Sequence, residues 1–317
     1  MHLLTQIRRR FITSFPVKFL IRKSKLIILP GFSGIPLFDV IRFFFIQIQQ
    51  TSLNERASSI AFNLLLAIPP AFIFLFTLLP YLPIKDLLKQ VYELIRDVIP
   101  GKSNHDPIIA FVQDFATRER SDLLSFGFIL ALYFSSNAMI GIMRSFNKMN
   151  YIGFSQRHYV HDRWVAIKLT LMLFMIILLS IIALVSRGAV LTWLGIENPT
   201  LRAIILNVRW IVIILLFFLT ISFIYRHAPA VHKKWKLINP GSILATFMMI
   251  TFTMGFSYYV VNFGNYNQLY GSIGTILILM LLIYFNSLVL LIGFELNVSI
   301  SSLRKLADQR KNPVSGG

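Results

Sequence analysis

The feature that most constrains this chain is a run of 58 consecutive uncharged residues, 237–294, which ends at Glu295. One crossing of the bilayer hydrocarbon takes about 20 mostly apolar residues in a helix, so the run is long enough for two crossings. Only 14% of the 317 residues are charged, whereas a soluble domain usually carries about 25%. The chain is therefore predicted to be a membrane protein.

Six stretches meet or approach the spanning length. Backbone groups in lipid must bond within their own segment, and these runs do not alternate as barrel strands would, so the spans are predicted to be α-helices. The predicted fold class is all-α, a polytopic membrane protein with six transmembrane helices and extra amphipathic interfacial helices. The six predicted spans are residues 58–80, 123–143, 164–186, 203–225, 240–262 and 272–295.

The distribution of positive charge predicts how the chain faces the membrane. Lys and Arg residues near spans are retained in the cytoplasm. Alternate connecting segments hold 21 of them on one side and 8 on the other. Both termini are therefore predicted to be cytoplasmic, with a basic arm at 1–36, a transmembrane domain at 37–303 and a cytoplasmic tail at 304–317.

The basic arm accounts for much of the net charge of +18. Because such clusters are attracted to the anionic inner leaflet, the predicted partners are membrane lipids, anionic at the cytoplasmic face, and not nucleic acid. The predicted headgroup contacts are Arg8, Arg9, Arg10, Arg22, Lys23 and Lys25. The sequence does not indicate an oligomeric state.

Two further segments are amphipathic. The outer segment 84–120 includes 86–99, which places its apolar residues at helical spacing on one face. This outer segment could lie in the headgroup plane or cover the end of the bundle, and the sequence favours neither. Residues 37–50 are apolar but too short to span, so they are predicted to form an interfacial elbow before the first span.

Polar residues within spans are candidates for a substrate or ion path, here Asn63, Asn137 and Glu295. Amides in spans also bind neighbouring helices together. Glu295 lies 12 residues beyond Ile283, the middle of its span, or about 18 Å at the helical rise. Half of the hydrocarbon is only about 15 Å. Glu295 is thus expected near the cytoplasmic interface, either as an acid paired with Arg144 or Arg56 or as a gate at the inner mouth.

Prolines and glycines mark two irregular places in the backbone. Pro69 and Pro70 lie midway along the first span and should kink or break its helix because each removes an amide donor. Gly271 and Gly274 belong to a tight connection between the fifth and sixth spans. Transporters use broken helices to build binding sites, although the same features also serve packing.

The sequence predicts no catalytic residue, metal or cofactor. The absence of cysteine excludes thiolate nucleophiles and disulfides. His158, His161 and Asp162 form a short cluster without a further ligand set, and a solvated loop is the favoured interpretation. The common nucleotide-binding, hydrolase and metalloprotease motifs are absent.

Three stretches resemble the YihY/BrkB family of bacterial inner-membrane proteins, a family once described as ribonuclease BN. They are residues 56–62 (RASSIAF), residues 225–229 (YRHAP) with Lys236 and Pro240-Gly241, and residues 270–274 (YGSIG) through 293–297 (GFELN). The similarity covers about residues 37–303, and the last stretch is the most specific.

The resemblance implies a six-helix protein of the bacterial inner membrane that is linked to envelope properties. The leading functional hypothesis is transport or flippase-like handling of a lipid or small solute. The alternative is a non-catalytic scaffold that binds partners or anionic lipids through its basic arm. Ribonuclease activity is not expected, because the histidine clusters of a metal-dependent hydrolase are absent.

Overall fold

The computed structural model describes residues 19, 22–81, 87–98, 102–116, 121–147, 158–185, 199–231, 234–263 and 272–311. Every element in these ranges is a helix, which confirms the all-α class. Five helices are long and apolar enough to cross a membrane. They are α4 (Leu53–Leu78), α7 (Ser121–Asn147), α8 (Tyr159–Val185), α11 (Pro240–Phe263) and α13 (Ser272–Lys311).

The fourth predicted span, 203–225, lies within α10 (Pro199–His227). Among the residues of α10 whose side chains are described, Ile214–His227 form an apolar helix that is shorter than a span. The whole helix has 29 residues, or about 44 Å at 1.5 Å per residue. A sixth crossing by α10 therefore stays a prediction.

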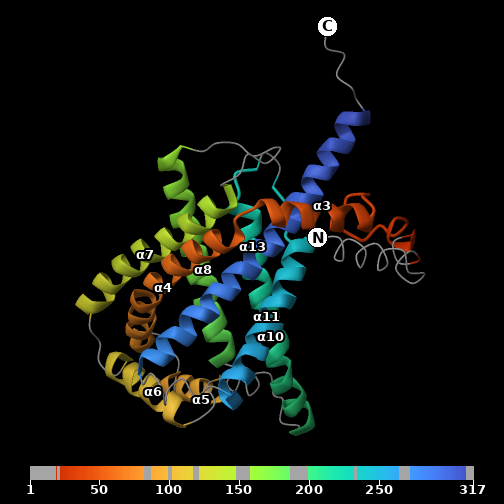
Figure 1. Ribbon diagram of the computed structural model, residues 1–317. Helices are drawn as coiled ribbons and strands as arrows, with labels where there is room; N and C mark the ends of the chain where they lie inside the picture. Colours follow the sequence, from red (N-terminus) through yellow and green to blue (C-terminus); the bar gives the residue numbers. More distant parts are fainter. Residues whose placement is uncertain are drawn as a thin grey trace.

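The long helices alternate in direction and form a ring (Figure 1). Contacts follow the order α4, α7, α8, α10, α11, α13 and return to α4. At one end of this ring the turn at 31–34, the described parts of the 228–239 connection and the last turns of α13 lie together. We call this the basic end, and the end that carries α5 and α6 the opposite end.

The double proline does not break α4. The helix is continuous through Pro69 and Pro70, and Figure 1 shows it bending along its length. A proline removes one amide donor, but its fixed backbone angle is helical, so the remaining bonds hold the two halves together. The predicted break is therefore wrong, whereas the predicted kink is visible as the bend.

Both predicted amphipathic segments are helical and pack on the bundle. In the outer segment, α5 (Leu87–Val98) and α6 (Lys102–Ala116) bury Val91 and Val112 against Leu79 at the end of α4. The two helices thus cover the end of α4, and their position relative to the headgroup plane stays a prediction. The elbow helix α3 (Leu37–Gln50) lies against α13 and buries Val40 on Ile300.

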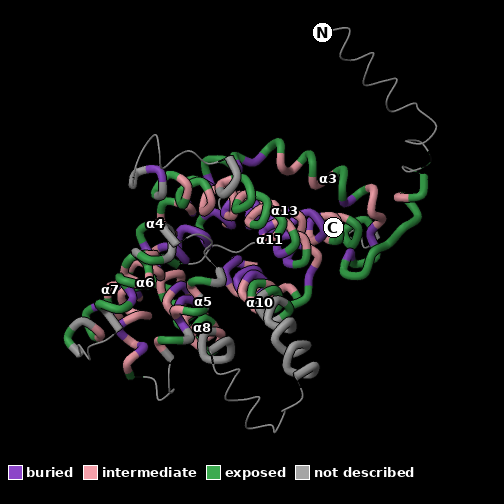
Figure 2. Tube along the Cα trace, turned by 90° about the horizontal axis from the view of Figure 1, so that it is seen from below, coloured by how far each residue is buried: buried purple, intermediate pink, exposed green. Residues whose placement is uncertain are grey.

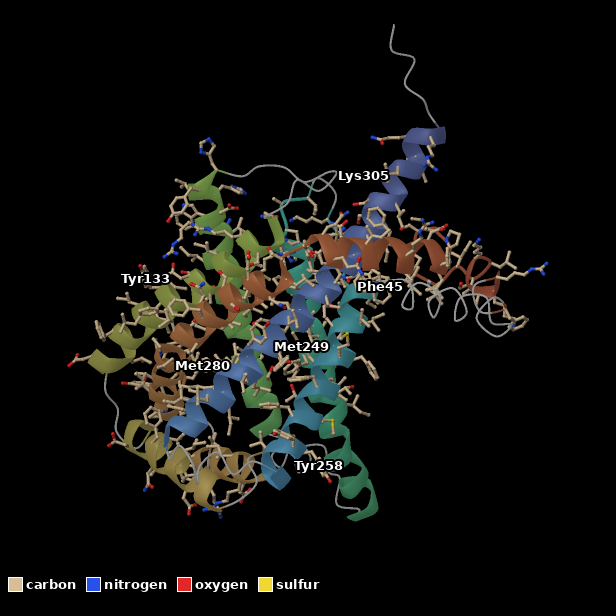
Figure 3. All side chains as sticks on the ribbon, viewed as in Figure 1. Phe45, Tyr133, Met249, Tyr258, Met280 and Lys305 are labelled. Carbon is tan, nitrogen blue, oxygen red and sulfur yellow. The ribbon has the colours of Figure 1, made fainter. Side chains whose placement is uncertain are left out.

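Tight packing is concentrated at the basic end. The main buried cluster includes residues 53–60, 139–146, 166–169, 221–228 and 289–298. By contrast, no side chain in 171–180, 250–260 or 276–286 is buried. Figure 2 shows the buried stretches of α11 and α13 beside each other, and Figure 3 places Met249 nearer the basic end than Met280 and Tyr258. The half of α8, α11 and α13 near the opposite end is therefore less buried, and its helices meet through ring contacts such as Phe74–Phe174 and Phe252–Phe285.

Two glycines allow α11 and α13 to cross in backbone contact. A Cβ added at Gly241 would lie 2.1 Å from the carbonyl oxygen of Gly293, and one added at Gly293 would lie 2.6 Å from that of Gly241. Small residues at such crossings let helices approach closely in membranes. The crossing holds the start of α11 against the middle of α13, directly beside Glu295.

Replacing Gly293 with Ala should destabilise the protein because the new methyl group would overlap the backbone of α11. Forced overpacking costs about 1–3 kcal/mol. The control is Gly255→Ala on α11, where no atom lies within 4 Å of an added Cβ, and Ala favours a helix by about 1 kcal/mol. Thermal unfolding of the purified protein in detergent should show a lower midpoint for Gly293→Ala only. Equal midpoints for the two variants would contradict the close crossing.

Candidate functional site

A buried ion pair joins the first turn of α4 to α13. Nη1 of Arg56 donates to Oε1 of Glu295 at 2.6 Å, and the side chains are 2% and 0% exposed. Of the two partners predicted for Glu295, Arg56 is therefore confirmed, and Arg144 is exposed. The pair connects residues 239 positions apart in the sequence, so its formation requires the ring of helices to close.

The guanidinium of this pair is only partly satisfied. Nε and Nη2 of Arg56 are buried and have no hydrogen-bond acceptor among the described residues. Desolvating two charges costs several kcal/mol per ion unless further hydrogen bonds offset it. A buried guanidinium with unmet hydrogen bonds contributes little to stability. Buried polar groups of this kind are found where a protein stores strain or carries out its function.

Aromatic side chains fill the ring beside the ion pair. The rings of Phe146 from α7 and Phe294 from α13 are stacked with centroids 4.0 Å apart. Tyr225 from α10 meets both rings edge-on and donates its hydroxyl to the carbonyl of Leu290 at 2.6 Å. Three helices that are not sequence neighbours thus meet at one level. We call Arg56, Glu295, Phe146, Tyr225 and Phe294 the plug.

An amide network fastens the plug to the start of α11. Asn297 donates to Oδ1 of Asn239 at 2.6 Å and accepts from the backbone N–H of Gly241 at 2.9 Å. Asn239 also accepts from the backbone N–H of Ser242 at 2.8 Å, which caps α11. The network is buried and orders the basic end around Glu295.

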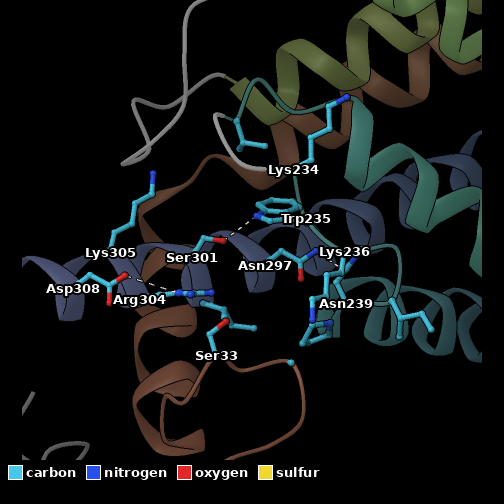
Figure 4. Close-up of a pocket in the computed structure, with 15 residues that line it drawn as sticks. Ser33, Lys234, Trp235, Lys236, Asn239, Asn297, Ser301, Arg304, Lys305 and Asp308 are labelled. Carbon is cyan, nitrogen blue, oxygen red and sulfur yellow. Dashed lines mark hydrogen bonds and ion pairs between the residues drawn. The ribbon is translucent and has the colours of Figure 1, made fainter.

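A pocket of about 580 Å³ opens at the basic end (Figure 4). Its wall includes Trp235, whose indole N–H donates to the Ser301 hydroxyl at 2.9 Å and whose ring lies 5.6 Å from that of Phe294. One side chain therefore contacts both the pocket and the plug. The charged lining residues are Lys234, Lys236, Arg304, Lys305 and Asp308.

Comparison with known proteins identifies the family to which this chain belongs. Residues 44–316 match the model of the family described as virulence factor BrkB. The chain belongs to the BrkB family. The ribonuclease-like protein YfkH of Bacillus subtilis (strain 168) is 30% identical over 259 residues, which cover 81% of this chain and 93% of YfkH.

Two shorter matches are to proteins described as UPF0761 membrane proteins. A UPF0761 membrane protein of Tolumonas auensis is 32% identical over 80 residues, 25% of this chain and 26% of that protein. One from Xanthomonas campestris pv. campestris (strain B100) is 32% identical over 96 residues, 30% of this chain and 23% of that protein. No solved structure matches this chain. With its spanning helices, this BrkB family member is a multi-pass membrane protein.

The structure brings together the stretches that carry the family resemblance. Arg56, Tyr225, Gly241, Gly293 and Glu295 come from three separate stretches and meet within or beside the plug. Sequence reasoning singled out only Glu295 among them as a site. The signal it missed is a pair of glycines, 241 and 293, within otherwise bulky spans.

Of the two amide candidates, Asn63 bonds within its own helix and packs near α7, whereas Asn137 joins two helices. Asn63 donates to the carbonyl of Ser59 at 2.8 Å, and a Cβ added at Gly141 of α7 would lie 3.1 Å from its Nδ2. Asn137 accepts a hydrogen bond from Arg163, which ties α7 to α8. Neither amide contacts Glu295, so the three predicted path residues do not form one cluster in this structure.

The remaining candidates lie apart from the plug. Gly274 is buried in the first turn of α13, and Gly271 lies outside the described residues. Arg22, Lys23 and Lys25 are exposed, whereas Arg8, Arg9 and Arg10 lie outside the described residues. Lys23 sits over the ring of Phe19 and Lys25 over that of Phe38, each 5.2 Å from the centroid.

The side chains of the plug and of the other described residues bear on a possible catalytic role. Within the described ranges, no group of three or more His, Asp and Glu side chains could hold a metal ion. The name of YfkH refers to that protein, and nothing in the plug supplies a nucleophile beside a general base. The charged contact of the plug is a single ion pair between α4 and α13.

A double-mutant cycle should show that Arg56 and Glu295 act as a unit. Glu295→Gln and Arg56→Gln each leave one buried charge unpaired, which costs about 3–5 kcal/mol. The double variant removes both charges and should recover a large part of that loss. Unfolding midpoints in detergent measure the coupling. Additive losses would show that the two side chains do not depend on each other.

Proposed function

We propose that this protein is a transporter or flippase-like protein that handles a lipid or small solute in the cell envelope. In this proposal it lies in the bacterial inner membrane with both termini cytoplasmic, so that the basic end faces the cytoplasm. The observation that carries the proposal is the unequal packing along the ring. Buried residues fill the basic end, while three helices lack any buried side chain over ten or more residues near the opposite end.

Such a distribution is what a closed inner gate with a loosely closed outer half would produce. Many helical transporters expose a site near the middle of the membrane first to one side and then to the other. They do so by moving one group of helices against another around that site. Here the plug is the inner gate, and the Arg56–Glu295 pair is its polar lock. Because Nε and Nη2 of Arg56 lack acceptors among the described residues, opening toward water would satisfy them.

Two amide contacts between helices fit this proposal, one at the candidate Asn137 and one at Asn286, a further amide within a predicted span. Asn137 and its partner Arg163 join α7 to α8, and Asn286 joins α11 to α13 through Thr253 at 3.4 Å. Each contact links two adjacent helices of the ring. A movement that separates these helices would expose the amides to the interior, where they could interact with a polar solute.

A second candidate is a non-catalytic scaffold that binds partners or anionic lipids through the basic arm. The exposed Arg22, Lys23 and Lys25 favour it, as does the dense packing of the plug. Removing residues 1–36 separates the two candidates. A scaffold should lose its cellular phenotype, whereas a transporter should keep most of it. Under either candidate we expect no ribonuclease activity in the purified protein.

Cysteine accessibility tests the proposed outer opening directly, because the native chain contains no cysteine. Residues seven positions apart lie on nearly the same face of an α-helix, so Ser287 and Met280 share the inward face of Phe294. In spheroplasts, a membrane-impermeant thiol reagent should label Met280→Cys. It should spare Leu281→Cys, which is turned by about 100° toward lipid and is similarly exposed, 42% against 44%.

Met249→Cys supplies the inner control, because this side chain is 8% exposed and belongs to the main buried cluster. It should stay unlabelled from either side of the membrane. If the reagent labels Met280→Cys in inverted vesicles but not in spheroplasts, the opening lies on the cytoplasmic side. That result would contradict the proposal. Equal labelling of Met280→Cys and Leu281→Cys would show that exposure on α13 does not depend on the helix face.

A further inference from the structure

The pocket at the basic end combines positive charge with an adjacent apolar surface. Four cationic side chains and one carboxylate line it, so its net charge is positive. Its volume of about 580 Å³ lies within the range of about 300–1,000 Å³ typical of ligand pockets. The cationic residues are Lys234, Lys236, Arg304 and Lys305, and the carboxylate is Asp308.

One wall of the pocket is a turn that packs closely against the ring of Pro240. Gly31 has a φ of +90°, and a Cβ there would lie 2.9 Å from the ring of Pro240 at the start of α11. Ser33, which also lines the pocket, has a φ of +55°, a conformation that costs a non-glycine residue energy. The turn is therefore seated against α11 and forms a wall that the surrounding structure holds in place.

Arg304 is the cation best placed to meet an anion in the pocket. Figure 4 shows its guanidinium extending from α13 toward the other lining residues, whereas Lys305 and Lys234 extend away from them. Arg304 lies 3.9 Å from Asp308, and the two side chains are 54% and 69% exposed, so this contact is weak and readily exchanged. A planar guanidinium with amide and hydroxyl neighbours is well suited to phosphate oxygens.

An apolar stripe begins at the same pocket and continues along α11. Ile238 lines the pocket and is 71% exposed. Ile243, Phe247, Met254 and Tyr258 follow at steps of four and seven, which place them on one helix face, and all are exposed. Since α11 begins at Pro240, the pocket lies at the level of the lipid headgroups and the stripe lies at the level of the acyl chains.

We infer that this pocket binds the phosphate-bearing headgroup of an anionic phospholipid, with the acyl chains along the exposed face of α11. The charge of the pocket selects the phosphate, and the continuous apolar stripe distinguishes a lipid from a free phosphate ion. Trp235 would sense the occupant because it contacts both the pocket and Phe294 of the plug. The inference concerns binding alone and does not require that the protein transports anything.

Binding is measured on the full chain, purified in a neutral detergent, as the rise in unfolding midpoint with added ligand. The ligands are dioctanoyl phosphatidylglycerol, dioctanoyl phosphatidylcholine and inorganic phosphate. The pocket variant combines Lys234→Gln, Lys236→Gln and Arg304→Gln. The control variant, Arg42→Gln with Lys89→Gln and Arg96→Gln, removes the same number of charges from exposed positions on α3 and α5, outside the pocket. All six side chains are exposed, so the unliganded variants should melt like the native protein.

The native protein should be stabilised by phosphatidylglycerol more than by the other two ligands. The pocket variant should bind phosphatidylglycerol weaker by about tenfold or more, whereas the control variant should change by less than about threefold. Equal loss in both variants would show general charge attraction and overturn the pocket. Equal stabilisation by inorganic phosphate would overturn the lipid assignment, and an unaffected pocket variant would overturn the site.

Discussion

The buried pair of Arg56 and Glu295 is the interaction on which the rest of this structure depends. It connects the first membrane helix to the last, and it lies where the aromatic rings of α7, α10 and α13 meet. Charge is expensive to bury, so the helices must be placed accurately enough for the Coulomb attraction to offset desolvation. The glycine crossing of α11 and α13 and the Asn239–Asn297 hydrogen bond supply that placement.

The same constraint explains why packing differs between the two ends. A ring of six helices needs large side chains to fill its centre, and the plug supplies them at the basic end only. Near the opposite end, the pairing of α4 with α7 and the cover formed by α5 and α6 provide local cores. The other helices rely on their neighbours at the basic end.

The helices could be predicted from the sequence, whereas the plug could not. The length and low charge of the apolar runs determine where helices form in lipid, and five of the predicted spans coincide with long apolar helices. Arg56 was one of two partners proposed for Glu295, and the depth of Glu295 in the membrane stays a prediction. The meeting of Tyr225, Phe146 and Phe294 depends on which helix faces which, and a span that is apolar all round carries little directional signal.

Pro69 and Pro70 also show that local sequence alone does not determine the packed structure. Pro69 and Pro70 signalled an interruption, yet α4 continues because packing against α7 supports both halves. Asn63 and Asn137 were grouped with Glu295 on chemistry alone, and their positions in the structure separate them. Local chemistry thus identified polar groups, while three-dimensional packing decided which of them share a site.

Pulsed electron paramagnetic resonance on the full chain in nanodiscs tests the central claim most directly. One pair of spin labels, at Tyr159 and Ile243, reports the basic end, and another, at Phe126 and Tyr258, reports the opposite end; all four side chains are exposed. If the Arg56–Glu295 pair locks the basic end, Glu295→Gln should lengthen the first distance and shorten the second. Unchanged distances at both ends would contradict the account.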